Sequence, residues 1–82
     1  MRQMTDFTFT IFSGHPSQHR DCAWPQFHRV AISAASVHAA AVAVEEIVES
    51  EGRRCGEYRE GAKLWYRIWN DGVIACTDYV VL

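Results

Sequence analysis

One helix-forming segment, flanked on both sides by strand-like segments, limits this chain to a small set of folds. Residues 37–50 read VHAAAVAVEEIVES; the alanines favour a helix, and Ser36 is a suitable N-cap. Gly52 fits the position just past the helix end. Apolar residues recur at helical spacing and form one stripe, made of Val37, Ala40, Ala41, Val44, Ile47 and Val48. A single amphipathic helix must bury this stripe against another element.

Four segments are predicted to be β-strands. Three of them, residues 5–12, 27–34 and 63–69, alternate with the period of two that is typical of strands, and the hairpin turn Asn70-Asp71-Gly72 predicts the fourth, residues 73–81. The first reads TDFTFTIF, in which apolar residues alternate with threonines. The 82 residues are enough for one domain, spanning residues 1–82. The sequence predicts an α+β fold, an antiparallel four-stranded sheet with one helix on one face, in the order ββαββ.

The third strand distinguishes the two faces of this sheet. Leu64, Tyr66 and Ile68 alternate with the set Lys63, Trp65, Arg67 and Trp69. The face with two cations is a poor core because buried charge is costly, so we expect it to point away from the helix. Tryptophan and arginine dominate binding hot spots, which makes Trp65, Arg67 and Trp69 a candidate contact surface.

Other roles for this tryptophan face remain open. The loop over residues 13–26 or 53–62 can fold across it, its aromatic rings can pack across strands, or it can close a homodimer. It can also stack bases of single-stranded nucleic acid, a mode that usually needs a positive groove.

The turn Asn70-Asp71-Gly72 decides which face the last strand presents. With a three-residue loop and a glycine bulge, Trp65 opposes Thr77; Ile74, Cys76 and Val80 join the core, and Tyr79 joins the tryptophan face. A two-residue Asp71-Gly72 loop shifts the register by one and reverses the faces. The sequence leaves both registers open.

The stretch GHPSQHRDCAW contains the residues that most resemble a chemical site. His15, His19 and Cys22 have metal-ligand character, but zinc takes four ligands and a second pair is missing. A Cys–His nucleophile pair would need a held base and a cleft. We therefore expect a polar loop, with no catalytic residue, metal or cofactor, and no enzymatic activity.

Charge and cysteine content restrict compartment and partners. The net charge is −2, so no overall positive field attracts nucleic acid or an anionic membrane. Three widely spaced cysteines do not form a disulfide framework, and we expect a cytoplasmic protein with reduced thiols. Glu45, Glu46 and Glu49 form an acidic helix face, which is either solvated or meets a basic surface of a partner.

The segments FHRVAISAASVHAAAVAVEEIV and KLWYRIWNDGVIACTDYVVL, with the strand before them, resemble small phage and mobile-element proteins, namely anti-CRISPR inhibitors of type I systems. The resemblance implies a stoichiometric inhibitor in a bacterial host that binds the type I surveillance (Cascade) complex. Such an inhibitor blocks target DNA binding or nuclease recruitment. No family signature assigns a role to an individual residue. The alternatives are a nucleic-acid-binding module that uses the tryptophan face and a homodimeric housekeeping protein; direct nucleic-acid binding is not expected for the inhibitor.

Overall fold

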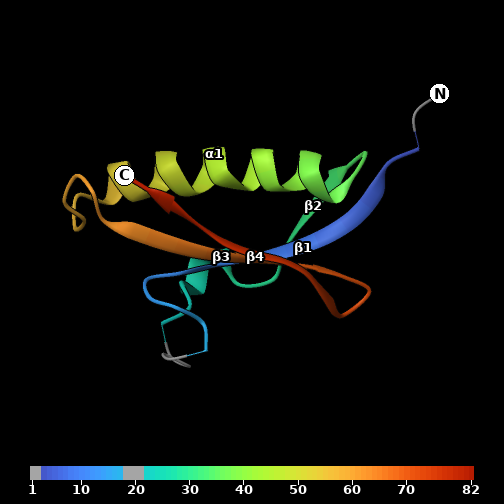
Figure 1. Ribbon diagram of the computed structural model, residues 1–82, viewed down its shortest axis with the longest axis horizontal. Helices are drawn as coiled ribbons and strands as arrows, with labels where there is room; N and C mark the ends of the chain where they lie inside the picture. Colours follow the sequence, from blue (N-terminus) through green and yellow to red (C-terminus); the bar gives the residue numbers. More distant parts are fainter. Residues whose placement is uncertain (1–2, 18–21) are drawn as a thin grey trace.

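The computed structural model describes residues 3–17 and 22–82. The elements are β1 (Thr5–Phe12), the short 3-10 helix η1 (Pro25–Phe27), β2 (Val30–Ala34), α1 (Val37–Cys55), β3 (Lys63–Asn70) and β4 (Val73–Val81). The four strands form one antiparallel sheet in the order β2-β1-β3-β4, and α1 lies across one face of it (Figure 1). The predicted α+β class and the ββαββ order are confirmed.

The core lies between α1 and the sheet, as the strand periodicity predicts. Phe7, Phe9 and Ile11 of β1 point toward the helix, in one cluster with alternate residues of β3 and one stripe of α1. The fully buried members contributed by β3 and α1 are Leu64, Tyr66, Ile68, Ala40, Val44 and Val48. Packing of this apolar surface is the main driving force that joins helix and sheet.

The helix is longer than the sequence pattern predicts. It begins at the predicted N-cap, where the Ser36 hydroxyl accepts a hydrogen bond from the Ala39 N–H at 3.1 Å, but it ends at Cys55. Gly56, with a φ of 70°, takes the left-handed conformation that ends the helix. Gly52, expected just past the end, is instead a buried residue within the helix. A side chain does not fit there, because an added Cβ would lie 2.6 Å from Leu64 Cδ1.

The second strand is shorter than predicted. It begins at Val30, because Pro25 starts η1 and Arg29 takes a left-handed conformation with a φ of 56°. The Arg29 N–H donates to the Thr10 hydroxyl at 3.0 Å, which ties this bend to β1. An extended stretch over residues 27–29 is therefore replaced by a turn that brings Arg29 beneath the sheet.

The final hairpin combines features of both predicted registers. Its turn has two residues, Asp71 and Gly72, both with positive φ, so Asn70 pairs with Val73. A β-bulge then offsets the register, and Trp65 opposes Tyr79 instead of Thr77. The bulge restores the predicted faces of Cys76, Val80 and Tyr79. The prediction for Ile74 is wrong: it opposes Trp69 outside the core and is 52% exposed.

Candidate functional site: the outer face of β3 and β4

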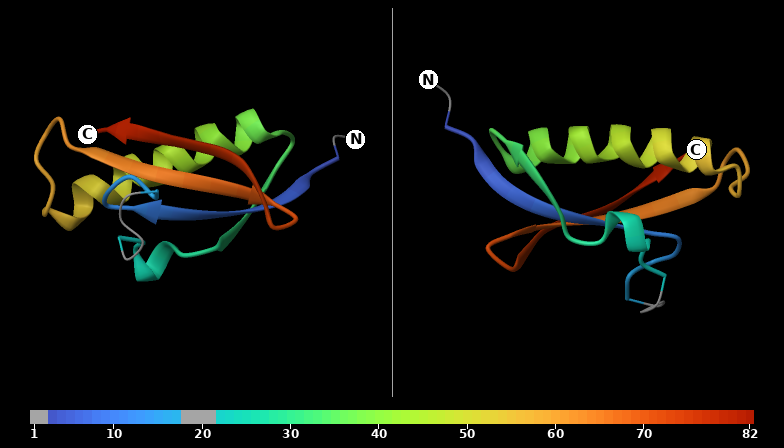
Figure 2. Two further views of the ribbon diagram at one scale, coloured as in Figure 1. Left: turned by 60° about the horizontal axis from the view of Figure 1, so that its bottom comes forward. Right: turned by 180° about the vertical axis from the view of Figure 1, so that it is seen from behind.

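The sheet surface opposite α1 carries the predicted contact residues. We define the outer face as the outward residues of β3 and β4, which are Lys63, Trp65, Arg67, Trp69, Ile74, Thr77, Tyr79 and Val81. The left view of Figure 2 shows this side of the sheet, where β3 and β4 lie next to each other. Cross-strand pairing thus places residues from two strands of one hairpin on one surface.

An aromatic cluster with a cation occupies one end of the outer face. The rings of Trp65 and Tyr79 lie 5.0 Å apart between centroids, within the range of favourable aromatic pairs. The Lys63 ammonium lies 4.7 Å from the Tyr79 ring centroid, and the His15 ring meets Trp65 edge-on at 4.4 Å. Trp65 is half-buried and Tyr79 is 40% exposed, so a partner can reach this cluster.

Arg67 lies in the middle of the outer face and is held across the hairpin. Its Nε donates a hydrogen bond to the Thr77 hydroxyl at 3.0 Å. The residue is half-buried, and its remaining guanidinium N–H groups are suited to carboxylates of a partner. Holding the side chain in place lowers the entropy that binding would otherwise cost.

Trp69 points outward as predicted but is not available for contact. It is 7% exposed, and the Arg29 guanidinium carbon lies 3.6 Å from its ring centroid. The residue that covers this end is Arg29, which precedes β2 and lies in neither of the loops, 13–26 or 53–62, that the sequence offers as covers. The accessible surface is centred on Trp65 and Tyr79, and Tyr79 is a residue whose face the sequence left open.

The loop after β1 contributes a ring to this surface and shows local hydrogen bonding. His15 Nδ1 accepts from the Ser17 N–H at 3.1 Å, while the same ring packs on Trp65. The Cys22 thiol donates to the Gly14 carbonyl at 3.5 Å. His19 lies outside the described residues. Within residues 3–17 and 22–82, no group of three or more His, Cys, Asp or Glu side chains is placed to hold a metal ion.

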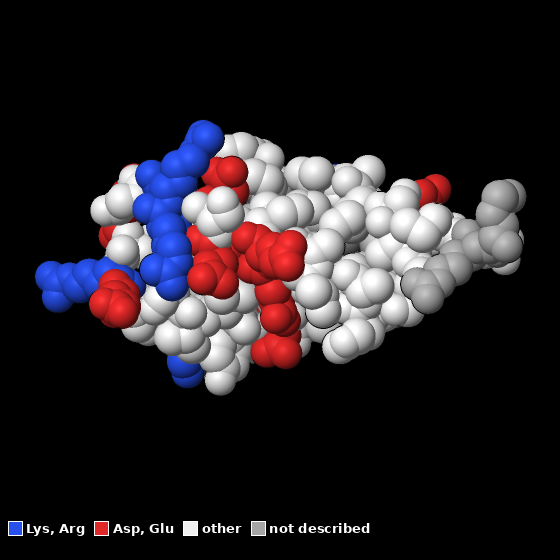
Figure 3. Space-filling model, turned by 90° about the horizontal axis from the view of Figure 1, so that it is seen from above, with Lys and Arg blue, Asp and Glu red and all other residues white. Residues whose placement is uncertain are grey.

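The acidic residues of α1 lie on the opposite side of the molecule and differ from one another. Glu45 is half-buried and accepts a hydrogen bond from the Tyr66 hydroxyl. Burial, and then this hydrogen bond, raise the pKa of Tyr66 far above its usual value. Glu49 pairs with Arg53 at 3.3 Å, and Glu46 is exposed. Figure 3 shows the acidic side chains beside a basic stripe at the end where α1 finishes.

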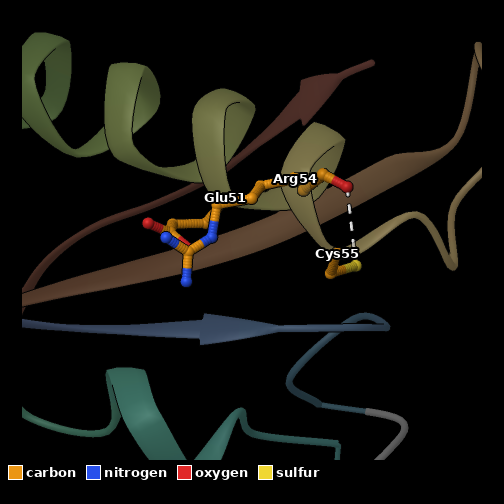
Figure 4. Close-up of polar contacts among 4 residues, drawn as sticks. Glu51, Arg54 and Cys55 are labelled. Atoms are coloured by element: carbon orange, nitrogen blue, oxygen red, sulfur yellow. Dashed lines mark hydrogen bonds and ion pairs between the residues drawn. The ribbon is translucent and has the colours of Figure 1, made fainter.

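A second group of aromatic residues, not indicated by the sequence pattern, lies at the C-terminal end of α1. Trp24 and Tyr58 stack with 5.7 Å between centroids beside a pocket of about 310 Å³. Cys55, which donates to the Gly52 carbonyl at 3.5 Å, also lines it, and Arg54 and Glu51 pair nearby at 3.5 Å (Figure 4). Trp24 and Tyr58 come from separate loops without periodicity, so only the folded chain brings them together beside the end of α1.

Comparison with known proteins assigns no family to the chain. No protein-family model, curated protein or solved structure matches it. Within the described residues, no helix has both the length and the apolar content to cross a membrane. The functional inference therefore depends on the surfaces described above.

Proposed function

We propose that this chain is a non-catalytic protein-binding protein that contacts its partner through the outer face of β3 and β4. One observation carries the proposal: Trp65, Tyr79 and Lys63 form an accessible cluster across the two strands of one hairpin. Partly exposed aromatic residues beside an anchored arginine have the composition of a binding hot spot. Cross-strand packing holds these side chains before a partner arrives, which lowers the cost of binding.

The partner that we propose is a type I CRISPR surveillance complex, bound stoichiometrically so that target DNA or the nuclease is excluded. Support comes from the resemblance of the strand, helix and hairpin segments to anti-CRISPR inhibitors. The molecule also offers acidic side chains on α1, with Glu46 exposed, which suit the basic grooves of nucleic-acid-binding proteins. Such inhibition needs a stable fold and a complementary surface, without a catalytic group.

Base stacking on single-stranded nucleic acid is less well supported by the same geometry. Such a platform uses ring faces open to solvent along a positive groove. Arg29 covers the ring of Trp69, and the His15 ring already packs against Trp65, so neither tryptophan is fully open to a base. The net charge of −2 also gives no general attraction to phosphate.

Co-elution with purified type I surveillance complexes tests the proposal. We expect the wild-type chain to co-elute at micromolar concentration and the double variant Trp65→Ala/Tyr79→Ala to lose at least about tenfold in affinity, as for truncation of a hot spot. Val42→Ala, at an exposed helix position, is the matched control and should bind as wild type.

Two results would contradict the proposal in different ways. Absence of wild-type co-elution with every complex of the panel refutes this partner. Binding by the double variant at wild-type affinity refutes this surface. Titration of tryptophan fluorescence with single-stranded oligonucleotides at low salt completes the test, and we expect no change in signal.

A further inference from the structure

The free edge of β4 is the longest unpaired strand edge in the described part of the chain. β4 has nine residues and pairs with β3 on one side, while its other side ends the sheet (Figure 2). Val73 is 68% exposed and Val81 is 54% exposed at its two ends. Natural proteins commonly protect such edges with charged side chains, proline, bulges or a covering element. β4 contains neither lysine nor proline, and its protection consists of the bulge near its start and the single charge of Asp78.

Hydrogen bonds show which residues of β4 direct their backbone toward the free edge. The Leu82 N–H donates to the Ala62 carbonyl at 2.9 Å, and the Leu82 carbonyl accepts from Gly61, so Leu82 bonds on the β3 side. Backbone direction alternates along an antiparallel strand, and Thr77, Tyr79 and Val81 therefore direct theirs outward. The Tyr79 N–H accordingly donates to the carboxylate of its neighbour Asp78 at 2.8 Å and not to β3.

Negative charge flanks this edge on the side of the helix. Asp78 is exposed, is the only charged residue of β4, and lies opposite Tyr66. The Tyr66 hydroxyl donates to Glu45 of α1, so two carboxylates lie beside the same tyrosine. On the outer face, the same edge presents Tyr79, which adds an apolar contact.

This charge distribution discriminates between the possible occupants of the edge. A second copy pairing antiparallel through β4 would bring two Asp78 carboxylates opposite or diagonal to each other when paired near the strand centre, and like charges at such positions destabilise a sheet. An extended segment with Lys or Arg on its helix side instead complements Asp78 and Glu45. Its apolar residues, at alternate positions, then lie along the outer face.

We propose that β4 binds an extended basic segment of a protein partner as a fifth strand, with Lys or Arg placed beside Asp78 and Glu45. The inference rests on the proposed function, since it requires a protein partner, and it names the backbone through which that partner docks. Main-chain hydrogen bonds from Thr77, Tyr79 and Val81 supply affinity, and the flanking carboxylates supply selectivity. On binding, the Tyr79 N–H exchanges Asp78 for a carbonyl of the added strand.

Titration of the full chain with two synthetic peptides tests this docking mode. One has eight residues of alternating valine and lysine, and the other has glutamate in place of lysine. We expect the lysine peptide to bind at least about tenfold more tightly, a difference of about 1.4 kcal/mol. Backbone amide NMR signals of Thr77, Tyr79 and Val81 should shift more than those of β2.

A pair of variants at one position separates the backbone from the side chain. Thr77→Pro removes an outward N–H that β3 does not use, a position where edge strands tolerate proline. Both Thr77→Pro and Thr77→Val remove the hydroxyl that accepts a hydrogen bond from Arg67, but Thr77→Val keeps the backbone N–H. We expect Thr77→Val to bind the lysine peptide within about twofold of wild type and Thr77→Pro to lose at least about tenfold. Val81→Pro with Val81→Ala provides a second pair if Thr77→Pro does not fold.

Three results would overturn the inference. In the first, the chain binds the two peptides with equal affinity or binds neither. In the second, the proline variants bind the lysine peptide as wild type does. In the third, sedimentation shows that the unliganded chain is a dimer and that Thr77→Pro dissociates it. The last result identifies a second copy as the occupant. A failed peptide titration with intact co-elution refutes the docking edge alone, whereas intact titration with failed co-elution refutes the surveillance complex as partner.

Discussion

The two edge strands of the sheet, β2 and β4, differ in length and in what protects their unpaired backbone groups. β2 has five residues, and the chain before it turns away through η1 and the left-handed Arg29, whose guanidinium covers Trp69. The Ser33 hydroxyl also donates to Asp6 at 2.8 Å, which links β2 to β1. β4 has nine residues, and the carboxylate of Asp78 bonds to one outward N–H at its free edge.

The difference indicates where this molecule can accept a partner. A short edge preceded by a turn offers few backbone groups in register, whereas a long one offers several. The outer-face cluster of Trp65 and Tyr79 lies on the β4 side, next to the long edge. Side-chain contacts and strand pairing can therefore act on one partner at the same side of the sheet.

The largest effect on stability is expected from adding a side chain at Gly52, where α1 packs closely against the C-terminal end of β4. In Gly52→Val, the added side chain meets Leu64 and Leu82, which lie 2.6 Å and 3.0 Å from an added Cβ. Overpacking of this kind should lower the free energy of unfolding by about 2 kcal/mol, measured by urea denaturation. Ser50→Val, at an exposed position of the same helix, is the control. Equal stability of both variants would show that α1 moves away without cost.

Gly52 also shows what periodicity can and cannot predict. The apolar stripe of α1 and the alternation of β1 and β3 identify the core, because burial of one face imposes a period on the sequence. A glycine near the end of a predicted helix can either end the helix or lie where another side chain packs closely against it. Only the position of Leu64 in the folded chain shows that Gly52 has the second role. The coverage of Trp69 by Arg29 escapes prediction for a similar reason, because 40 residues separate the pair.

The β4 side should also respond to alkaline pH, through the buried hydroxyl of Tyr66 on the neighbouring strand β3. Burial and the bond to Glu45 raise the pKa of Tyr66 above its usual value near 10, so the folded state retains a proton that the unfolded state loses. This stabilisation is complete below pH 10 and falls as the pH rises, by up to about 1.4 kcal/mol per pH unit. Urea denaturation at pH 8, 10 and 11 measures the slope.

Tyr66→Phe is the control for this pH dependence, since it removes the titrating hydroxyl and retains the ring. We expect the variant to lose less stability than wild type between pH 10 and 11. Equal slopes in the two proteins would show that Tyr66 is deprotonated in the folded state at its usual pH, contrary to the bond with Glu45.

The smallest effect is expected at the β2 side, from removal of the side chain that covers Trp69. Arg29→Ala deletes the guanidinium that lies 3.6 Å from the ring centroid, and its loss should cost about 0.5–1 kcal/mol of stability. Acrylamide quenching should rise, because the Trp69 ring becomes accessible. Arg29→Lys retains a cation but not the planar stacking, and should quench to an intermediate extent. If quenching is unchanged in both variants, backbone packing and not the Arg29 side chain covers Trp69, and the β2 side is closed independently of this residue.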